Sequence, residues 1–320
     1  MNFNLDVLKI DPVQELDKLS EFIVGQVNAR RKRGVIVGLS GGIDSACIAA
    51  VAVHALGKEK VTGLVLPETE SNPISSEYAI KHAQALGIEH RQIDITSTVD
   101  SVVKYNWRDE YLQNLIPEYK PGYKYNITLP TDLLERASYS FYRLQVQMPD
   151  GELKSKRLNL DELLAITSFA NIKIRARMLH LYAEAERRGL LVIGTTNRTE
   201  FLLGDFCKYG DGGTDIEPIT HLYKNQIYQL SDHLKVIPEI IDRQPSPDTF
   251  SLSVSDQEFF FRISFDKLDH LLYAWEHEVP KNEAAKVLAL SEDAVERSYN
   301  DFASKNRATA HLREVPVTLK

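Results

Sequence analysis

The segment GLSGGIDSA, residues 38–46, contains the residue types from which phosphate-binding loops are built. Its glycines let the backbone turn sharply and bring N–H groups close to a ligand, because no Cβ lies in the way. The hydroxyls of Ser40 and Ser45 can donate hydrogen bonds to phosphate oxygens, and the N-terminal end of the following helix adds a positive field. The three glycines are Gly38, Gly41 and Gly42. This combination predicts an anion-binding loop.

Asp44 is the unusual member of this loop, because a carboxylate repels phosphate unless a cation lies between them. Mg²⁺ commonly takes one or two carboxylates together with phosphate oxygens, so Asp44 indicates a magnesium–nucleotide complex. The loop is not a Walker A sequence, since no Gly-Lys-Ser/Thr follows, and it is not a GxGxxG dinucleotide turn. The structural alternative is a glycine-rich turn in which Asp44 caps a helix.

Two further sets of polar residues have spacings that suit ligand binding. Asn171 and Arg175 are four residues apart in a helical pattern and therefore share a face. Arg177 is expected to point elsewhere and to serve packing or an ion pair. Asp211 and Asp215 flank a pair of glycines in a tight turn, where carboxylates suit ribose hydroxyls or an incoming ammonium ion.

The elements that must position these residues alternate between strand and helix. Apolar runs predict four parallel strands, at 34–39, 61–66, 90–95 and 190–194. Helical patterns at 44–57 and 75–87 end at Gly57 and Gly87, and serines are expected to cap the second helix. Right-handed crossovers then predict an α/β fold with a doubly wound, mostly parallel sheet.

The middle of the chain, 105–160, is rich in tyrosine and is expected to be an insertion in this core. The segment 141–158 predicts a β-hairpin, because Pro-Asp-Gly lies between two alternating runs. The aromatic and basic residues of the insertion suggest a lid or wall over the substrate, and a surface elaboration is the alternative. They are Tyr105, Trp107, Arg108, Tyr111, Tyr119, Tyr123, Lys124, Tyr125, Arg136, Tyr139 and Tyr142. A long helix is expected from Asp161, and a helical part at 260–320 completes a single domain, 1–320.

Composition and charge restrict the class of protein. The chain has 320 residues, of which 43% are hydrophobic and 26% charged, and a formal net charge of −7, all ordinary for a globular protein. The mild acidity argues against nucleic acid as a partner. No apolar stretch is long enough to span a bilayer and no signal pattern is visible, so a cytoplasmic protein is expected. Cys47 and Cys207 are too few for a disulfide framework or a four-cysteine zinc site.

The loop at 38–46 resembles the pyrophosphatase loop of the N-type ATP pyrophosphatases, which split ATP into AMP and pyrophosphate. Further segments follow in the order and approximate spacing of the ammonia-dependent NAD synthetases. They are ANIKIRARM, VIGTTNRTE, FCKYGDGGTDIEPITHLYKNQIYQL, RQPSPDTFSLSVSDQE and KNRATAHLREVP. The resemblance covers roughly 20–100 and 160–316. It implies an AMP-forming ligase that amidates deamido-NAD with ammonia through an acyl-adenylate.

The resemblance also implies a role for each matching residue. ATP would be bound by the loop residues named above together with Thr195, Lys224 and Ser246. Mg²⁺ would be bound by Asp44 and Glu200. Deamido-NAD would be bound by Asn171, Arg175, Lys208, Asp211 and Asp215. The catalytic residues would be Asp44, Lys208, Asp211 and Lys224.

The helix at 161–188 is apolar on more than one face, which predicts an isologous homodimer with Arg175 near the interface. The chain has no room for a glutaminase domain, so free ammonia or a separate glutaminase would supply the nitrogen. Two alternatives stay open. One is a related amide ligase that adenylates another carboxylate, favoured by the insertion and by the absence of arginine at 66–77. The other is a non-catalytic adenine-nucleotide sensor, and a tRNA-modifying relative is disfavoured by the acidic charge.

Overall fold

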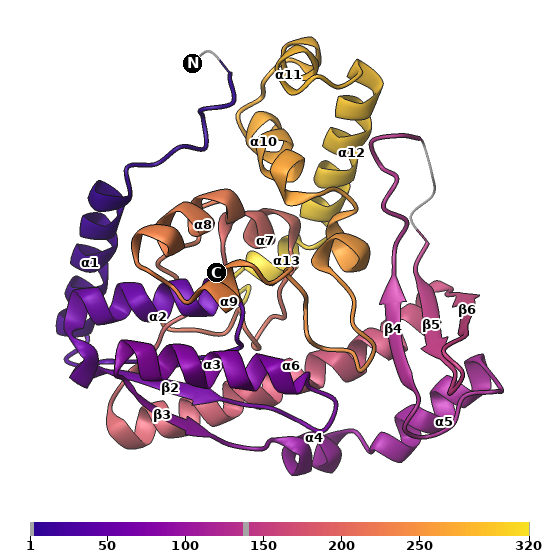
Figure 1. Ribbon diagram of the computed structural model, residues 1–320, viewed down its shortest axis with the longest axis horizontal. Helices are drawn as coiled ribbons and strands as arrows, with labels where there is room; N and C mark the ends of the chain where they lie inside the picture. Colours follow the sequence, from indigo (N-terminus) through magenta and orange to yellow (C-terminus); the bar gives the residue numbers. More distant parts are fainter. Residues whose placement is uncertain (1–2, 137–140, 320) are drawn as a thin grey trace.

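Four strands at the centre of the molecule form a parallel sheet with the order β3-β2-β1-β7 (Figure 1). The computed structural model describes residues 3–136 and 141–319. The strands are β1 (Val35–Gly38), β2 (Val61–Val65), β3 (Glu89–Gln92) and β7 (Leu191–Val192). Val35 of β1 lies opposite both Val61 and Leu191. The predicted parallel α/β fold is confirmed, although the third strand ends at Gln92 and not at residue 95.

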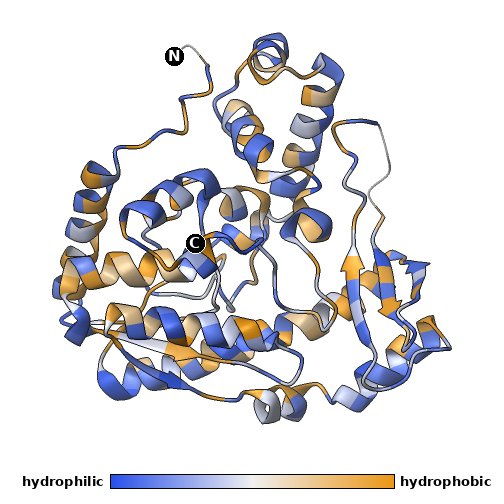
Figure 2. Ribbon diagram, in the orientation of Figure 1, coloured by the Kyte–Doolittle hydropathy of each residue, from blue (hydrophilic) through white to orange (hydrophobic). Residues whose placement is uncertain are grey.

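Alternate residues of β1 face two different helical layers. Val35 and Val37 pack against the first layer, and Ile36 packs against the second. The first layer contains α1 (Pro12–Ala29), α2 (Ile43–Leu56), α3 (Pro73–Leu86), α8 (Lys224–His233) and α9 (Pro238–Ile241). The second contains α4 (Thr96–Val102) and α6 (Leu160–Arg188). Burial on both faces explains the continuous apolar run of β1, and Figure 2 shows α2 as hydrophobic along most of its length.

The ends of these helices follow from local residues. Gly57 and Gly87 end α2 and α3 as predicted, and Gly87 adopts a left-handed conformation with φ +68°. The predicted serine cap of α3 is wrong, because the helix begins earlier, at Pro73, and Asn72 Oδ1 accepts a hydrogen bond of 3.1 Å from the N–H of Ile74. After α2, a short 3₁₀ helix, η1 (Lys58–Lys60), leads into β2.

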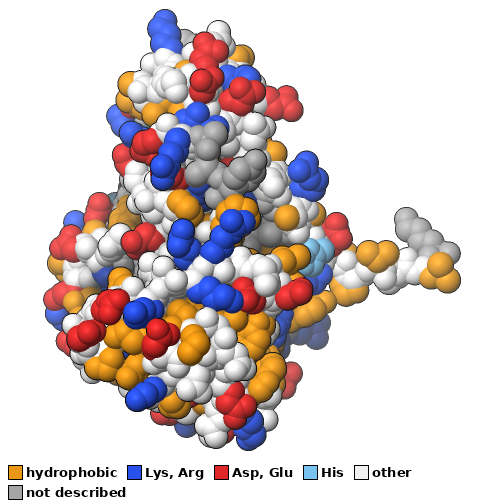
Figure 3. All heavy atoms as spheres, turned by 90° about the vertical axis from the view of Figure 1, so that its right-hand side faces the viewer, with side chains coloured by type: hydrophobic (Ala, Val, Ile, Leu, Met, Phe, Trp, Pro, Cys, Tyr) orange, Lys and Arg blue, Asp and Glu red, His pale blue; other side chains and the backbone are white. Residues whose placement is uncertain are grey.

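The inserted region forms its own small structure beside α6. It contains α5 (Tyr105–Leu115) and an antiparallel sheet of β4 (Lys124–Thr128), β5 (Arg143–Gln147) and β6 (Leu153–Arg157). The predicted hairpin is confirmed by the pairing of β5 with β6. Tyr119 and Tyr125 are buried in the core that this sheet shares with Ile166 of α6, and Tyr139 lies outside the described residues. Figure 3 shows the face that includes this region, with acidic and basic side chains interspersed among apolar ones.

The remaining chain is mainly helical, as predicted for its C-terminal part. It contains α7 (Arg198–Leu203), the π-helix η2 (Gln257–Phe261), α10 (Phe265–Glu276), α11 (Lys281–Leu288), α12 (Glu292–Ala308) and α13 (Ala310–Arg313). Helices α10, α11 and α12 form the upper part of the molecule in Figure 1 around a second apolar cluster. Within the described ranges, no helix combines the length and apolar character that crossing a membrane requires.

Candidate active site

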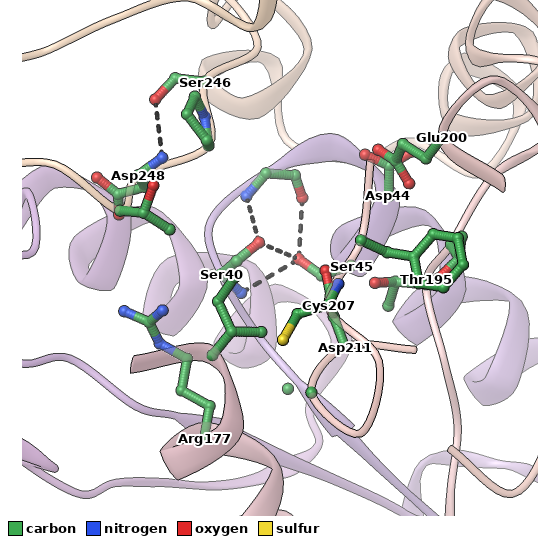
Figure 4. Close-up of a pocket in the computed structure, with 18 of the residues that line it drawn as sticks. Ser40, Asp44, Ser45, Arg177, Thr195, Glu200, Cys207, Asp211, Ser246 and Asp248 are labelled. Atoms are coloured by element: carbon green, nitrogen blue, oxygen red, sulfur yellow. Dashed lines mark hydrogen bonds between the residues drawn. The ribbon is translucent and has the colours of Figure 1, made fainter. Parts of the chain in front are cut away.

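A cavity of about 500 Å³ lies at the carboxyl ends of β1, β2 and β7. Parallel strands end at the same edge of a sheet, so the loops that follow them converge there. The walls come from the loop after β1, from residues between 64 and 76, from one face of α6, and from residues 194–200, 204–214 and 243–250. Figure 4 shows side chains from these segments around the cavity.

The loop after β1 is held in shape by its own hydroxyl groups (Figure 4). Ser45 Oγ donates to the carbonyl of Gly42 at 3.0 Å, accepts from the N–H of Ser40 at 3.2 Å, and lies 3.0 Å from Ser40 Oγ. Gly41 has φ +74°, and a Cβ at this position would lie 2.2 Å from the carbonyl oxygen of Ser75. Glycine is therefore required here, and the hydrogen bonds of Ser40 and Ser45 fix the shape of the loop.

Asp44, Glu200 and Lys224 converge beside this loop from three separate segments. Asp44 Oδ2 lies 2.5 Å from Lys224 Nζ, and its Oδ1 accepts a hydrogen bond of 3.0 Å from Asn197 Nδ2. Glu200 Oε1 lies 3.8 Å from the same ammonium group, and Glu200 Oε2 accepts from the N–H of Asn197 at 3.1 Å. Asp44 does not cap α2, because the N-cap of that helix is Gly42. The structural alternative for Asp44 is therefore wrong.

Buried carboxylates dominate the electrostatics of this part of the cavity. Burial raises the pKa of Glu200 well above its usual range, and the nearby charge of Asp44 raises it further. Burial alone would lower the pKa of Lys224, but Asp44 and Glu200 raise it, so the ammonium group stays charged. Burial also raises the pKa of Asp256 to about 6 and that of Asp205 to about 8. Sequence reasoning missed these last two acids, because neither belongs to a recognisable short motif.

The donor set of Asp44 and Glu200 fits Mg²⁺. Their carboxylates lie next to the phosphate loop in a region with several buried acids and one lysine. In residues 3–136 and 141–319, no group of three or more His, Cys, Asp or Glu side chains is arranged to hold a metal by itself. Mg²⁺ is typically held by one or two carboxylates and completes its octahedron with phosphate oxygens and water.

Asp211 in the Gly-rich turn 210–213 and Asp215 just after it lie in different surroundings. Asp211 faces the cavity, and its Oδ1 accepts hydrogen bonds from the N–H groups of Cys207 at 2.6 Å and Gly212 at 3.2 Å. Burial nevertheless raises the pKa of Asp211. Asp215 does not line the cavity. Its Oδ2 accepts a hydrogen bond of 2.8 Å from the N–H of Val192, which ties this segment to β7.

The face of α6 that lines the cavity includes Asn171 and Arg177 but not Arg175. The expectation that Arg177 points away from the site is wrong, since its side chain lines the cavity (Figure 4). Its Nε donates to the carbonyl of Leu66 at 3.0 Å. Arg175 Nε donates to the carbonyl of Lys208 at 3.3 Å. Lys208 also lies outside the cavity, and its Nζ donates to the carbonyls of His311 at 2.6 Å and Glu314 at 3.0 Å.

Thr195 and Ser246 both line the cavity, and Ser246 Oγ accepts from the N–H of Asp248 at 3.3 Å (Figure 4). Arg243 is a further cavity residue that sequence reasoning missed. Its guanidinium donates to Ser75 Oγ at 2.9 Å and to the carbonyl of Gly41 at 3.4 Å, which places a positive charge beside the phosphate loop.

Comparisons with known proteins agree with this arrangement. A family model described as NAD synthase matches residues 15–134 and 144–316. The chain is 37% identical to an NH₃-dependent NAD⁺ synthetase of Rhizobium meliloti, over 98% of this chain and 94% of that protein. It is 38% identical to one of Mesorhizobium japonicum, over 97% and 98% of the two chains. A third, from Thermotoga maritima, is 36% identical over 86% and 95%.

Solved structures show the same fold. An NH₃-dependent NAD synthetase from Campylobacter jejuni superposes with a TM-score of 0.64 at 25% identity and covers 98% of this chain and 100% of its own. An NMN synthetase from Francisella tularensis superposes with a TM-score of 0.68 at 23% identity, over 97% and 99% of the two chains.

Proposed function

The chain belongs to the NAD synthase family, and on this premise we propose that it is an ammonia-dependent NAD synthetase. It converts deamido-NAD, ATP and ammonia into NAD, AMP and pyrophosphate. The relatives that match nearly its whole length carry this activity in their names.

The chemistry has two steps. A carboxylate is a poor acyl donor, because it is negatively charged and would have to expel oxide. A carboxylate oxygen of deamido-NAD therefore attacks the α-phosphorus of ATP, and pyrophosphate leaves. Ammonia then attacks the acyl carbon, and AMP leaves with the former carboxylate oxygen. No side-chain nucleophile is needed, which agrees with Cys207, whose pKa burial raises to about 11.

The chain contributes mainly position and charge. We propose that the phosphates of ATP bind at the loop 38–46, with Thr195 and Ser246 as further contacts. Lys224 lies beside this loop, and Asp44 holds its ammonium group in place at 2.5 Å. A fixed positive charge at this point stabilises the charge that develops on the phosphates, because it needs no reorganisation during the reaction.

We assign Asp44 and Glu200 to Mg²⁺. When bound, this ion supplies positive charge to the phosphate oxygens and to the leaving pyrophosphate. Asn197 orients both carboxylates, since its side-chain amide donates to Asp44 at 3.0 Å and its backbone N–H donates to Glu200 at 3.1 Å.

We propose that deamido-NAD extends from the cavity to its outer rim. Asn171 and Asp211 would contact it inside the cavity, where both side chains are found. Arg175, Lys208 and Asp215 would contact it or hold its binding surface outside the cavity. A homodimer built on α6 would bring a second copy to this side of the molecule.

One observation carries the proposal. Asp44, Glu200 and Lys224 meet at a phosphate loop, in a chain that matches the NAD synthase model over almost its whole length. The test is incubation of the protein with MgATP, ammonium and deamido-NAD, with NAD and AMP measured together. We expect equal amounts of both, and no NAD without ammonium.

The same assay separates the alternatives. Amidation of nicotinic acid mononucleotide in place of deamido-NAD would identify an amide ligase for another carboxylate. Binding of MgATP without turnover of either acid would identify a nucleotide sensor. A cytoplasmic location and a supply of ammonia that is free or delivered by a separate glutaminase belong to the same proposal.

A further inference from the structure

A buried network of charged residues joins the inserted segment to the wall of the cavity. Of the segment's described residues, Tyr142 lines the cavity, whereas Tyr119 and Tyr125 are each 1% exposed within the core of the insertion. The charged residues that join this core to the cavity wall are also buried. They come from α5, α6 and the turn after β2.

Lys173 of α6 is the centre of this network and is 1% exposed. Its Nζ donates to Glu70 Oε2 at 2.6 Å and to the carbonyl of Thr249 at 3.1 Å, and it lies 2.9 Å from Glu68 Oε1. The three donors of the ammonium group thus meet three acceptors. Two of these belong to the turn after β2, and the third belongs to the segment 243–250, which also lines the cavity.

Helix α5 of the insertion completes the network. Arg108 NH1 lies 2.6 Å from Glu70 Oε1, and the hydroxyl of Tyr105 donates to Glu68 Oε2 at 2.7 Å. The guanidinium of Arg108 also lies 4.9 Å from the ring centre of Tyr105, and Arg108 is 5% exposed. Each carboxylate of the turn is therefore held from both sides, by Lys173 of the core and by a residue of the insertion.

The turn that carries Glu68 and Glu70 also orients the guanidinium group of Arg177, which lines the cavity. Ser71 Oγ accepts from the N–H of Glu68 at 3.1 Å and from Arg177 NH2 at 3.3 Å. Arg177 Nε donates to the carbonyl of Leu66 at the other end of the same turn. The position of the Arg177 guanidinium therefore depends on the shape of residues 66–71.

We propose that Arg108 and Tyr105 of the insertion are positioning residues for nucleotide binding, because they hold the turn 66–71 and, through it, the Arg177 guanidinium in the cavity wall. The inference rests on the proposed function only in naming the nucleotide as ATP. A second tie supports it, since the N–H of Leu252 donates to the carbonyl of Tyr125 at 2.9 Å and fixes the segment after Thr249 to β4.

The charged character of the network makes the proposal testable. Removing one partner of a buried ion pair leaves the other charge uncompensated, and the surrounding structure must shift to expose it to water. Arg108→Met leaves Glu70 with Lys173 as its remaining cation, and it leaves the largely buried Asp109, which lies 2.7 Å from Arg108 NH2, without a cation. Both carboxylates should therefore shift, and the turn should loosen. Glu70→Gln in the same chain removes the charge that has lost its second cation, while Lys173 keeps Glu68 as a partner, so it should relieve much of the displacement of the turn.

The experiment compares the equilibrium Kd for MgATP and the steady-state constants of full-length variants. For Arg108→Met we expect Kd and KM for ATP to rise at least about tenfold, with kcat at saturating ATP within about threefold of the parent. Arg108→Lys and the double variant Arg108→Met/Glu70→Gln should each recover most of the loss. Lys154→Met, which removes a half-buried lysine from β6 of the same insertion, away from the network, should change neither constant.

Unchanged Kd and KM in a folded Arg108→Met protein would overturn the proposal, as would a fall in kcat alone. The proposal would also be overturned if the double variant Arg108→Met/Glu70→Gln bound MgATP no better than Arg108→Met. If Arg108→Met does not fold, Tyr105→Phe decides, because it removes one hydroxyl at nearly constant volume and should raise KM for ATP about two- to fivefold. Absence of NAD formation by the parent protein would refute the proposed function, while the Kd comparison would still test the network.

Discussion

Asp44 is the residue on which the proposed chemistry depends most. Asp44→Asn removes a charge at nearly constant volume and deprives Lys224 of its partner at 2.5 Å. We expect pyrophosphate release to slow at least about a hundredfold, or roughly 2.7 kcal/mol. The protein should still fold, because Glu200 remains 3.8 Å from the buried Lys224 ammonium group, but its Tm should fall, because Lys224 loses its nearer partner. Glu200→Gln should behave likewise, whereas Asp232→Asn, at an exposed position of α8, should not. Near-normal turnover of Asp44→Asn would remove the metal-ligand assignment.

Asp205 governs a pH dependence of stability. Burial raises its pKa to about 8 in the folded chain, so folding favours the protonated acid. Its contribution to stability is present below the unfolded pKa of about 4 and is lost as the pH rises through about 8. We expect Asp205→Asn, without substrates, to be more stable than the parent at pH 9 by at least about 1 kcal/mol, or about 2–4 °C in Tm. The difference in Tm between the two proteins should shrink as the pH falls from about 8 toward about 4, and parallel Tm curves across this range would contradict the assignment.

At the residue scale, the sequence predicted the phosphate loop better than the face of α6. The loop is contiguous, so its glycines and serines are neighbours in any fold. The cavity-lining stripe on α6 runs from Thr167 to Leu181, and its direction depends on tertiary packing. Arg175 lies about 40° beyond Asn171 around the helix and falls just outside this stripe, while Arg177 falls inside it.

At the scale of elements, the loop between β1 and α2 must keep its backbone shape. Gly41→Ala would force an alanine into φ +74° with its Cβ 2.2 Å from a backbone oxygen of α3. We expect the Kd for MgATP to rise at least about tenfold and Tm to fall. Gly25→Ala is the matched control, because a Cβ there meets nothing within 4 Å in the middle of α1 and should leave Kd unchanged. If Gly41→Ala and Gly25→Ala bind MgATP equally well, the loop can accommodate a Cβ at position 41, and the requirement for glycine there is refuted.

The elements were largely predictable because their signals are local. Alternation around Pro-Asp-Gly predicted the hairpin, and continuous apolar runs predicted β1 and β2. The role of the insertion was not predictable, because an aromatic-rich segment has the same composition whether it lines a cavity or fills a core. Only the fold shows that Arg108 meets Glu70, which lies 38 positions earlier in the chain.

At the scale of the whole molecule, α6 retains exposed apolar residues beyond those packed on the sheet. Leu164 is 57% exposed and Leu179 is 58% exposed. We expect a homodimer at micromolar concentration by light scattering, and we expect Leu179→Arg to shift it toward monomer. Val13→Arg, at an exposed apolar position of α1, should leave the mass unchanged. A strictly monomeric parent protein would contradict the dimer.

The central claim is that the carboxylate of deamido-NAD attacks the α-phosphorus of ATP. Its most direct test is turnover of deamido-NAD labelled with ¹⁸O in the carboxylate, followed by mass spectrometry of the AMP. The acyl-adenylate route transfers one carboxylate oxygen to the phosphate, so each AMP should carry one ¹⁸O for each NAD formed. Formation of NAD with unlabelled AMP, or with ADP in place of AMP, would contradict the account.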